Sequence, residues 1–132
     1  MISSAVAGKG RRAMELDYFE PWEFKCPCCG LGPDRMNPVF VARLDQARGL
    51  AGVPFLITSG WRCERHNAEV GGSETSSHMK GLAVDIECRL SGARFQILWA
   101  LRVVGFNRIG IRKDFIHVDM DYDKPPRLVW VY

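Results

Sequence analysis

The apolar residues of this chain come in short runs, and the length of those runs limits what the chain can fold into. The longest, such as residues 53–57 and 97–101, span five residues each. A membrane-spanning helix needs about 20 consecutive apolar residues, so the sequence predicts no membrane span. Short runs suit the strands and amphipathic helices of a globular domain. A chain of 132 residues is long enough for one such domain with a real core.

Turn and cap residues divide the chain into expected elements. Asn37 and Pro38 are typical of the start of a helix, and Gly52 of its end. Ser91 is expected to cap a later helix that Gly105 closes. A short helix is expected over residues 63–70, and strands over residues 54–58, 82–88, 108–111, 115–120 and 128–132. Helices separated by short strands, with several strands late in the chain, predict an α+β fold with a mostly antiparallel sheet.

The net charge of +3 belongs to the N-terminal arm rather than to the domain. The chain has 18 basic and 15 acidic residues, and Lys9, Arg11 and Arg12 account for the difference. A nucleic-acid-binding domain would spread its Lys and Arg over one face, so we expect no nucleic-acid partner. Residues 1–14 do not form a recognisable signal peptide, because the charges follow a short apolar stretch. We expect a flexible arm over 1–14 and one domain over 15–132.

The five cysteines leave several structural roles open. Cys26, Cys28 and Cys29 cluster in CPCCG, whereas Cys63 and Cys88 stand alone. Without a recognised secretion signal, reduced thiols are the default expectation. The cluster could form a metal knuckle, although a matching CxxC or HxxxH partner is missing. A disulfide between Cys63 and Cys88, or between Cys26 and Cys63, is equally open at this stage.

Histidine is scarce, and two of the three histidines lie close to aspartates. A catalytic zinc site needs three protein ligands and an open position, and two imidazoles with a carboxylate are a common set. His78, Asp85 and His117 can supply that set. Asp85 lies in the apolar segment LAVDI, where a lone buried charge would be costly and a metal would offset the cost. The alternative is an aspartate on the solvent side of an edge strand.

Asp114 is a candidate general base, because it precedes His117 by three residues. A carboxylate beside a metal-bound water can take its proton and later pass it to the leaving amine. Strand alternation would place these two residues on opposite faces, so the role requires a turn between Lys113 and Phe115. The alternative is a plain turn aspartate.

Three further residues have candidate roles near such a site. Asp119 shares the face of His117 and could accept a hydrogen bond from its ring, or could be a surface charge. Arg62 follows the segment TSGW and could bind an oxyanion or a substrate carboxylate, or could be a solvated charge. We expect His66 to have a structural or substrate-facing role rather than to be a fourth metal ligand. The sequence leaves open which of these two roles it has.

Three blocks of sequence together resemble one known family. Residues 76–85, SSHMKGLAVD, match the pattern SxHxxGxAxD; DFIHVD at 114–119 matches a second signature, and TSGWR at 58–62 precedes both. These blocks resemble the zinc D-Ala-D-Ala carboxypeptidase family of metallopeptidases, which also contains dipeptidases and phage cell-wall endopeptidases. The likeness is to its short single-domain branch, whose members often begin with an aromatic segment such as EFKC at 23–26. It covers about residues 18–132.

The resemblance implies a role for each matching residue. The expected ligands of one Zn²⁺ are His78, Asp85 and His117, with Asp114 as general base. Arg62 is expected to stabilise the oxyanion or bind the substrate terminus, and Ser76 to hold substrate. The implied fold is α+β and similar to Hedgehog domains and DD-peptidases, with an antiparallel sheet beneath the metal and helices on its other side.

The expected function is therefore hydrolysis of peptidoglycan stem peptides, with a D-Ala-D-Ala end as the first choice. One alternative is a phage endopeptidase that cuts within the stem, for example at L-Ala–D-Glu. Another is a zinc-binding virion or partner-binding domain with little turnover, as in Hedgehog signalling domains. We expect a monomer that is made in the cytoplasm without a recognised signal and acts at the cell wall or periplasm. A phage-encoded or virion-associated protein would fit this expectation.

Overall fold

A five-stranded sheet organises the described part of the chain, residues 15–132 of a computed structural model. The strand order is β2-β3-β5-β4-β6, and the pairs are antiparallel except for β4 with β6. The strands are β2 (Ile57–Ser59), β3 (Ala83–Glu87), β4 (Arg108–Ile111), β5 (Phe115–Asp119) and β6 (Leu128–Val131). The predicted α+β fold with a mostly antiparallel sheet is confirmed. The expected arm, residues 1–14, lies outside the described residues.

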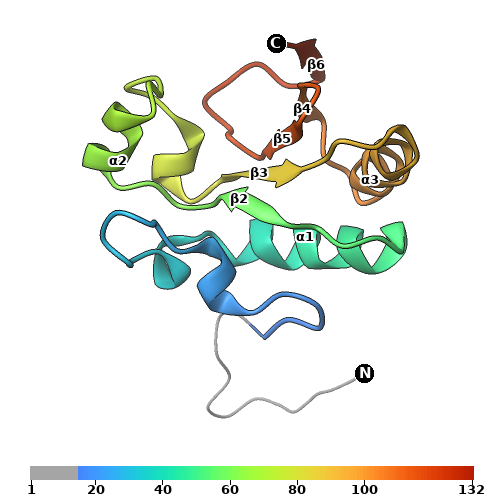
Figure 1. Cartoon of the computed structure of the whole chain (residues 1–132), viewed down its shortest axis with the longest axis horizontal. Helices are drawn as coiled ribbons and strands as arrows, with labels where there is room; N and C mark the ends of the chain where they lie inside the picture. Colours follow the sequence, from blue (N-terminus) through green and yellow to red (C-terminus); the bar gives the residue numbers. More distant parts are fainter. Residues whose placement is uncertain (1–14) are drawn as a thin grey trace.

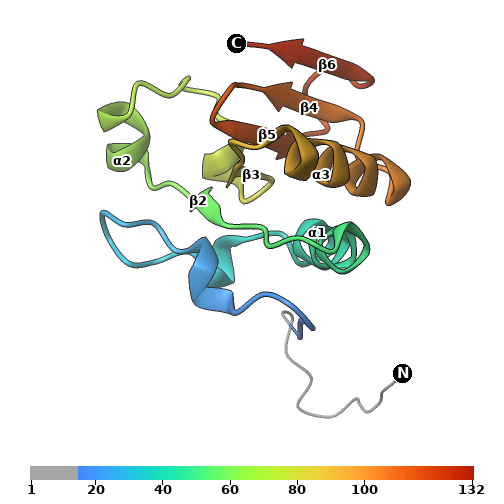
Figure 2. The same ribbon diagram turned by 45° about the vertical axis from the view of Figure 1, so that its right-hand side comes forward.

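In the described part of the chain, three α-helices and three short 3-10 helices complete the fold (Figure 1). The α-helices are α1 (Pro38–Ala51), α2 (Glu64–Glu69) and α3 (Ser91–Val103), and the 3-10 helices are η1 (Pro21–Phe24), η2 (Pro33–Arg35) and η3 (Ser77–Lys80). In Figure 1, α2 lies at the left and α3 at the right, and Figure 2 shows α3 in front of the sheet. Within residues 15–132, every helix is too short or too polar to cross a membrane.

The two long helices begin differently from each other. The Asn37 side chain accepts hydrogen bonds from the backbone N–H groups of Val39 and Phe40, and Gly52 ends α1 in the left-handed region, as the sequence predicts. The prediction for α3 was wrong by one residue: Leu90 is the cap, and Ser91 is the first helical residue. Leu90 offers no side-chain cap. The helix α3 is stabilised instead by the burial of its own apolar face, which carries Ile97, Ala100 and Leu101.

The two faces of the sheet have opposite chemistry. On one face, apolar side chains of β3, β4 and β5 join the buried residues of α1 and α3 in a single cluster. The other face carries a row of paired residues that crosses all five strands. The row consists of Ser59, Asp85, His117, Gly110 and Trp130. Strand alternation thus places the polar residues opposite the core.

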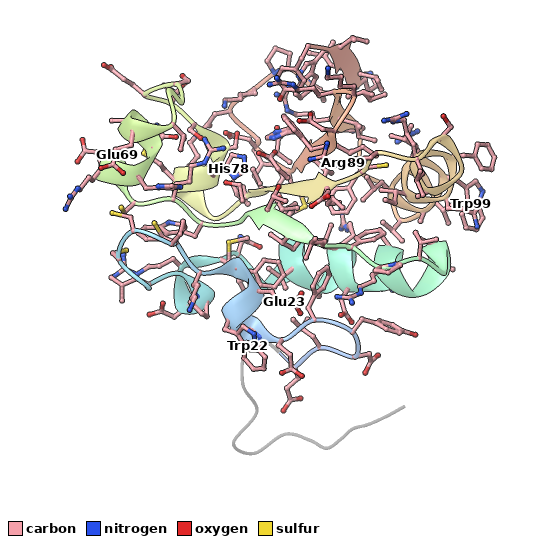
Figure 3. The ribbon with its side chains drawn as sticks, viewed as in Figure 1. Trp22, Glu23, Glu69, His78, Arg89 and Trp99 are labelled. Atoms are coloured by element: carbon pink, nitrogen blue, oxygen red, sulfur yellow. The ribbon has the colours of Figure 1, made fainter. Side chains whose placement is uncertain are left out.

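The aromatic segment before α1 packs on the core through only some of its residues. Phe19 and Phe24 are buried, whereas Tyr18 and Trp22 are exposed. The buried carboxylate of Asp45, on α1, accepts hydrogen bonds from three successive backbone N–H groups at residues 17–19. These bonds attach the segment to α1. Trp99 is likewise exposed, on the outer side of α3 (Figure 3).

Candidate metal centre

His78, Asp85 and His117 come from three different elements and meet on the polar face of the sheet. Asp85 and His117 are directly paired residues of β3 and β5, and both are buried. The strand that carries Asp85 is paired on both sides, so the alternative of a solvent-facing aspartate on an edge strand was wrong. His78 lies on η3, in the interior between α2 and the sheet (Figure 3).

The segment around His78 shows why its sequence pattern is specific. Ser76 is the cap of η3, and its hydroxyl accepts a hydrogen bond from the backbone N–H of His78 at 3.2 Å. Gly81 ends η3 with φ of 73°, a conformation that favours glycine. A Cβ at this position would also collide with the backbone carbonyl of Arg35. Serine and glycine in SxHxxG therefore fix the short turn that presents His78.

Both histidines direct one ring nitrogen at the same carboxylate oxygen. Nδ1 of His117 lies 2.9 Å from Oδ1 of Asp85, and Nε2 of His78 lies 3.4 Å from that atom. One nitrogen from each ring and a carboxylate oxygen lie within 4.8 Å of one another. Three donor atoms thus converge from three elements.

The opposite ring nitrogens are held by hydrogen bonds. Nδ1–H of His78 donates to the backbone carbonyl of Gly60 at 2.9 Å. Nε2–H of His117 donates to Oδ2 of Asp119 at 2.8 Å, and Oδ1 of Asp119 accepts from Nε of Arg108 at 2.7 Å. Partners of this kind fix the tautomer and orientation of metal-binding histidines.

The charges of the group are mutually stabilised. Burial raises the pKa of Asp85, but the hydrogen bonds with His117 and His78 outweigh burial and hold that pKa well below its usual value. Burial lowers the pKa of His117, but its bonds to Asp119 and Asp85 outweigh burial and raise it. The pKa of Asp119 is lowered, because the bonds from His117 and Arg108 outweigh its burial. The raised pKa of His117 favours its protonated ring, which places positive charge beside Asp85, as a cation at the same place would.

The donor set fits zinc on chemical grounds. Zinc accepts imidazole nitrogen and carboxylate oxygen, and catalytic sites use three protein ligands so that one position stays open. Cu(I) favours thiolate and thioether ligands, and Mg²⁺ favours oxygen ligands alone. The anchored rings of His78 and His117 leave Nε2 and Nδ1, respectively, as the nitrogens that face Asp85.

A cleft of about 500 Å³ opens over this group. His78, Asp85 and His117 lie on its wall, together with Arg62 and Ser76. Further lining residues are Arg108, Arg112, Lys124, Trp130 and Tyr132. Cationic side chains outnumber the carboxylates of Asp85 and Asp119 on this wall, which favours an anionic ligand.

Arg62 is anchored beside the group. Its Nε donates to Oγ of Ser59 at 3.0 Å, Nη1 donates to Oδ1 of Asn67 at 3.1 Å, and Nη2 lies 3.5 Å from Oδ2 of Asp85. A guanidinium group carries more N–H donors than these three bonds use. Arg62 can therefore still donate to a ligand in the cleft.

The structure places Asp114 in the turn between β4 and β5. The chain does turn between Lys113 and Phe115, as a general-base role requires. The carboxylate is not on the cleft wall; it lies 3.4 Å from Nε of Arg112, which is on the wall. Oδ1 of Asp114 is buried without a hydrogen-bond partner. His66 lies apart from the three converging residues, on α2, with Nδ1 3.9 Å from Oε1 of Glu69.

Sequence reasoning did not single out Tyr132, which lines the far wall of the cleft together with Trp130. The Trp130 ring lies 5.6 Å from that of His117 between centroids, and a Cβ on Gly110 would collide with the Trp130 indole. Glycine at this position lets the indole lie across the sheet next to His117. Trp130 and Tyr132 share one face by strand alternation, but the sequence could not show which strand β6 would join.

The comparison with protein families agrees with this geometry. The family model described as Peptidase M15 matches residues 18–119. The chain therefore belongs to the peptidase M15 family, whose members are zinc peptidases that act on peptidoglycan. A search of curated proteins found no match.

Proposed function

We propose that this protein is a zinc D-Ala-D-Ala carboxypeptidase, which removes the terminal D-alanine of peptidoglycan stem peptides. The observation that carries the proposal is the convergence of His78, Asp85 and His117 on the wall of a cationic cleft, next to Arg62. The family supports a peptidase of the cell wall. The choice of bond rests on the position of Arg62.

The three converging residues would hold the ion. When bound, zinc lowers the pKa of water and polarises the scissile carbonyl. Asp119 keeps the His117 ring oriented, and the Gly60 carbonyl does so for His78. Asp114 is the proposed base: it takes a proton from the attacking water and returns it to the departing amine. Its Oδ1 makes no hydrogen bond, and its ion pair with Arg112 at 3.4 Å places the carboxylate directly behind a side chain of the cleft wall.

Arg62 suits a substrate that ends one residue beyond the scissile bond. Its Nη2 lies 3.5 Å from Oδ2 of Asp85, so the cation is within about one residue length, ~3.8 Å, of the carboxylate that would bind the ion. A terminal carboxylate would lie about that far from the carbonyl under attack. Arginine can bind it with two parallel hydrogen bonds. Ser76, on the same wall, would contribute a further polar contact to the peptide.

The decisive assay incubates the zinc-loaded protein with a defined muropeptide that ends in D-Ala-D-Ala, and identifies the products by mass spectrometry. Release of free D-alanine alone is expected. Cleavage between L-Ala and D-Glu would replace the carboxypeptidase with an endopeptidase. Bound zinc without any turnover would instead favour a binding domain.

Two variants separate the proposed roles. Asp114→Asn should retain zinc and lose at least ~100-fold in kcat, because general-base catalysis contributes about that much. Arg62→Lys should raise KM for the peptide more than it lowers kcat, because a lysine cannot form the paired contact. The control is Arg65→Lys, an exposed arginine on α2, which should leave both constants unchanged. Full activity in Asp114→Asn would remove this residue from the mechanism.

A further inference from the structure

Four of the five cysteines meet at one corner of the molecule, away from the row of polar residues on the sheet. Cys26, Cys28 and Cys29 lie in the loop after η1, and Cys63 is the cap of α2. Figures 1 and 2 show this loop alongside the segment that joins β2 to α2. The backbone N–H of Trp61 donates to the carbonyl of Phe24 at 2.9 Å, which holds the two segments together.

The sulfur atoms are close enough to share one ion. Sγ of Cys26 lies 3.7 Å from Sγ of Cys63, and the Sγ atoms of Cys26, Cys29 and Cys63 all lie within 4.8 Å of one another. The thiol of Cys28 interacts with that of Cys63. All four are free thiols in the structure. A disulfide requires about 2.05 Å between sulfurs, so the present arrangement is a cluster of thiols.

The local backbone is shaped like a metal-binding knuckle. Cys26 and Cys29 have the CxxC spacing, and the chain reverses immediately after them at Gly30, where φ is 75°. The turn is closed by two backbone hydrogen bonds, from Gly30 N–H to the Cys26 carbonyl at 2.8 Å and from Cys26 N–H to the Leu31 carbonyl at 2.7 Å. Such a turn presents two sulfurs on one side.

Backbone N–H groups also point at the sulfurs. Sγ of Cys63 accepts from the backbone N–H of His66 at 3.4 Å. Backbone groups at Cys63, Cys29 and Cys28 likewise donate hydrogen bonds to the Cys26 sulfur. Bonds of this kind stabilise thiolate, which is the form that binds metal.

We propose that Cys26, Cys29 and Cys63 bind a second, structural zinc ion, with Cys28 as the fourth ligand. Structural zinc is tetrahedral and accepts four cysteine sulfurs. Cys28 is the remaining thiol in contact with the cluster, and its exposure leaves it free to turn toward the ion. The charges of Arg65 and Glu69, which pair with each other, act on Cys28 in opposite directions.

The ion would cross-link two segments 37 residues apart and hold the corner that carries Arg62. Arg62 directly precedes Cys63, so the cross-link would limit motion of the arginine at the neighbouring cleft. The two metal sites are independent in their ligands. The cysteine site can therefore be tested whether or not the protein hydrolyses peptides.

The test measures zinc per chain by elemental analysis in protein purified with a thiol reductant. The wild type should contain about two zinc ions, and both Cys29→Ser and Cys63→Ser should contain about one. Serine is a good helix cap, so Cys63→Ser keeps the start of α2. Cys28→Ser should bind the second ion at least ~10-fold more weakly, as expected for a site reduced to three ligands. Unchanged affinity in that variant would overturn the assignment of Cys28.

Two controls identify which site holds the ion. Cys88→Ala removes a buried cysteine outside the cluster and should keep both ions. His117→Ala should lose the ion of the His-Asp-His group and retain the cysteine site. When that variant is loaded with Co²⁺, it should show intense sulfur-to-cobalt charge-transfer absorption, which oxygen and nitrogen ligands do not give.

Either of two results would overturn the proposal. One is a zinc content that does not fall when Cys29 or Cys63 is replaced. The other is a count of only three free thiols in the denatured protein purified without reductant, together with no second zinc under reducing conditions. That outcome would indicate one disulfide instead of a metal site, for which Cys26 and Cys63, with sulfurs 3.7 Å apart, are the first candidates.

Discussion

Replacing Asp119 by asparagine tests whether this carboxylate orients the His117 ring for metal binding. Oδ2 accepts from Nε2 of His117 at 2.8 Å, and Oδ1 accepts from Nε of Arg108 at 2.7 Å and from the backbone N–H of Asp121 at 3.2 Å. Asparagine has nearly the same shape but only one acceptor oxygen and no charge. Its amide N–H₂ group must therefore face one of these donors.

The expected losses of stability and of zinc affinity follow from the hydrogen bonds that asparagine cannot keep. Losing one charge-assisted hydrogen bond in a buried site should lower the free energy of unfolding by about 2 kcal/mol. With a less firmly oriented His117, zinc affinity should fall by roughly 10–100-fold. That range corresponds to about 1.4–2.8 kcal/mol of binding free energy.

Zinc affinity is measured by competition with a chromophoric chelator at constant pH, and stability by chemical denaturation of the metal-free protein. The control is Asp123→Asn, because the Asp123 side chain is highly exposed and pairs with Lys80, while its backbone N–H donates to Oδ1 of Asp121 and is unaffected by the change. It should leave zinc affinity unchanged. Wild-type affinity in Asp119→Asn would show that the bond to His117 has no part in holding the ion.

Three further predictions follow from the packing and charges. Gly110→Ala should lower the free energy of unfolding by about 1–3 kcal/mol, because its Cβ would collide with the Trp130 indole; a denaturation midpoint equal to wild type would contradict this. Asn37→Ala should cost about 1 kcal/mol in the same assay, since it removes the cap of α1, whereas Asn37→Ser should keep most of that energy. Asp121 should stabilise the fold above its unfolded pKa of 3.8 and lose this effect as the pH falls toward about 2. Although burial raises the pKa of Asp121, bonds from Ser77 and Lys80 outweigh burial and lower it to about 2. Asp121→Asn should therefore flatten the acid limb of a stability–pH curve; a limb as steep as that of wild type would argue against this assignment.

The sequence determined the local structure and the identity of the three converging residues. Asn37 with Pro38 marked the start of α1, and Gly52 its end, because caps and left-handed residues act within one turn of the chain. The spacing SxHxxGxAxD marked His78 and Asp85, since its serine and glycine fix the η3 turn next to β3. Period-two alternation likewise separated His117 from the core-facing Ile116 and Val118.

Only the tertiary structure decided which distant segments became neighbours. The pairing of β4 with β6 brought Trp130 over Gly110 and next to His117, and nothing local in either strand specifies its partner. The sequence alone also could not single out Cys63 as the residue that joins Cys26 and Cys29, because Cys63 lies far along the chain from CPCCG and stands alone. Local hydrogen bonds and side-chain periodicity are encoded within a few residues, whereas these contacts depend on how the whole core packs.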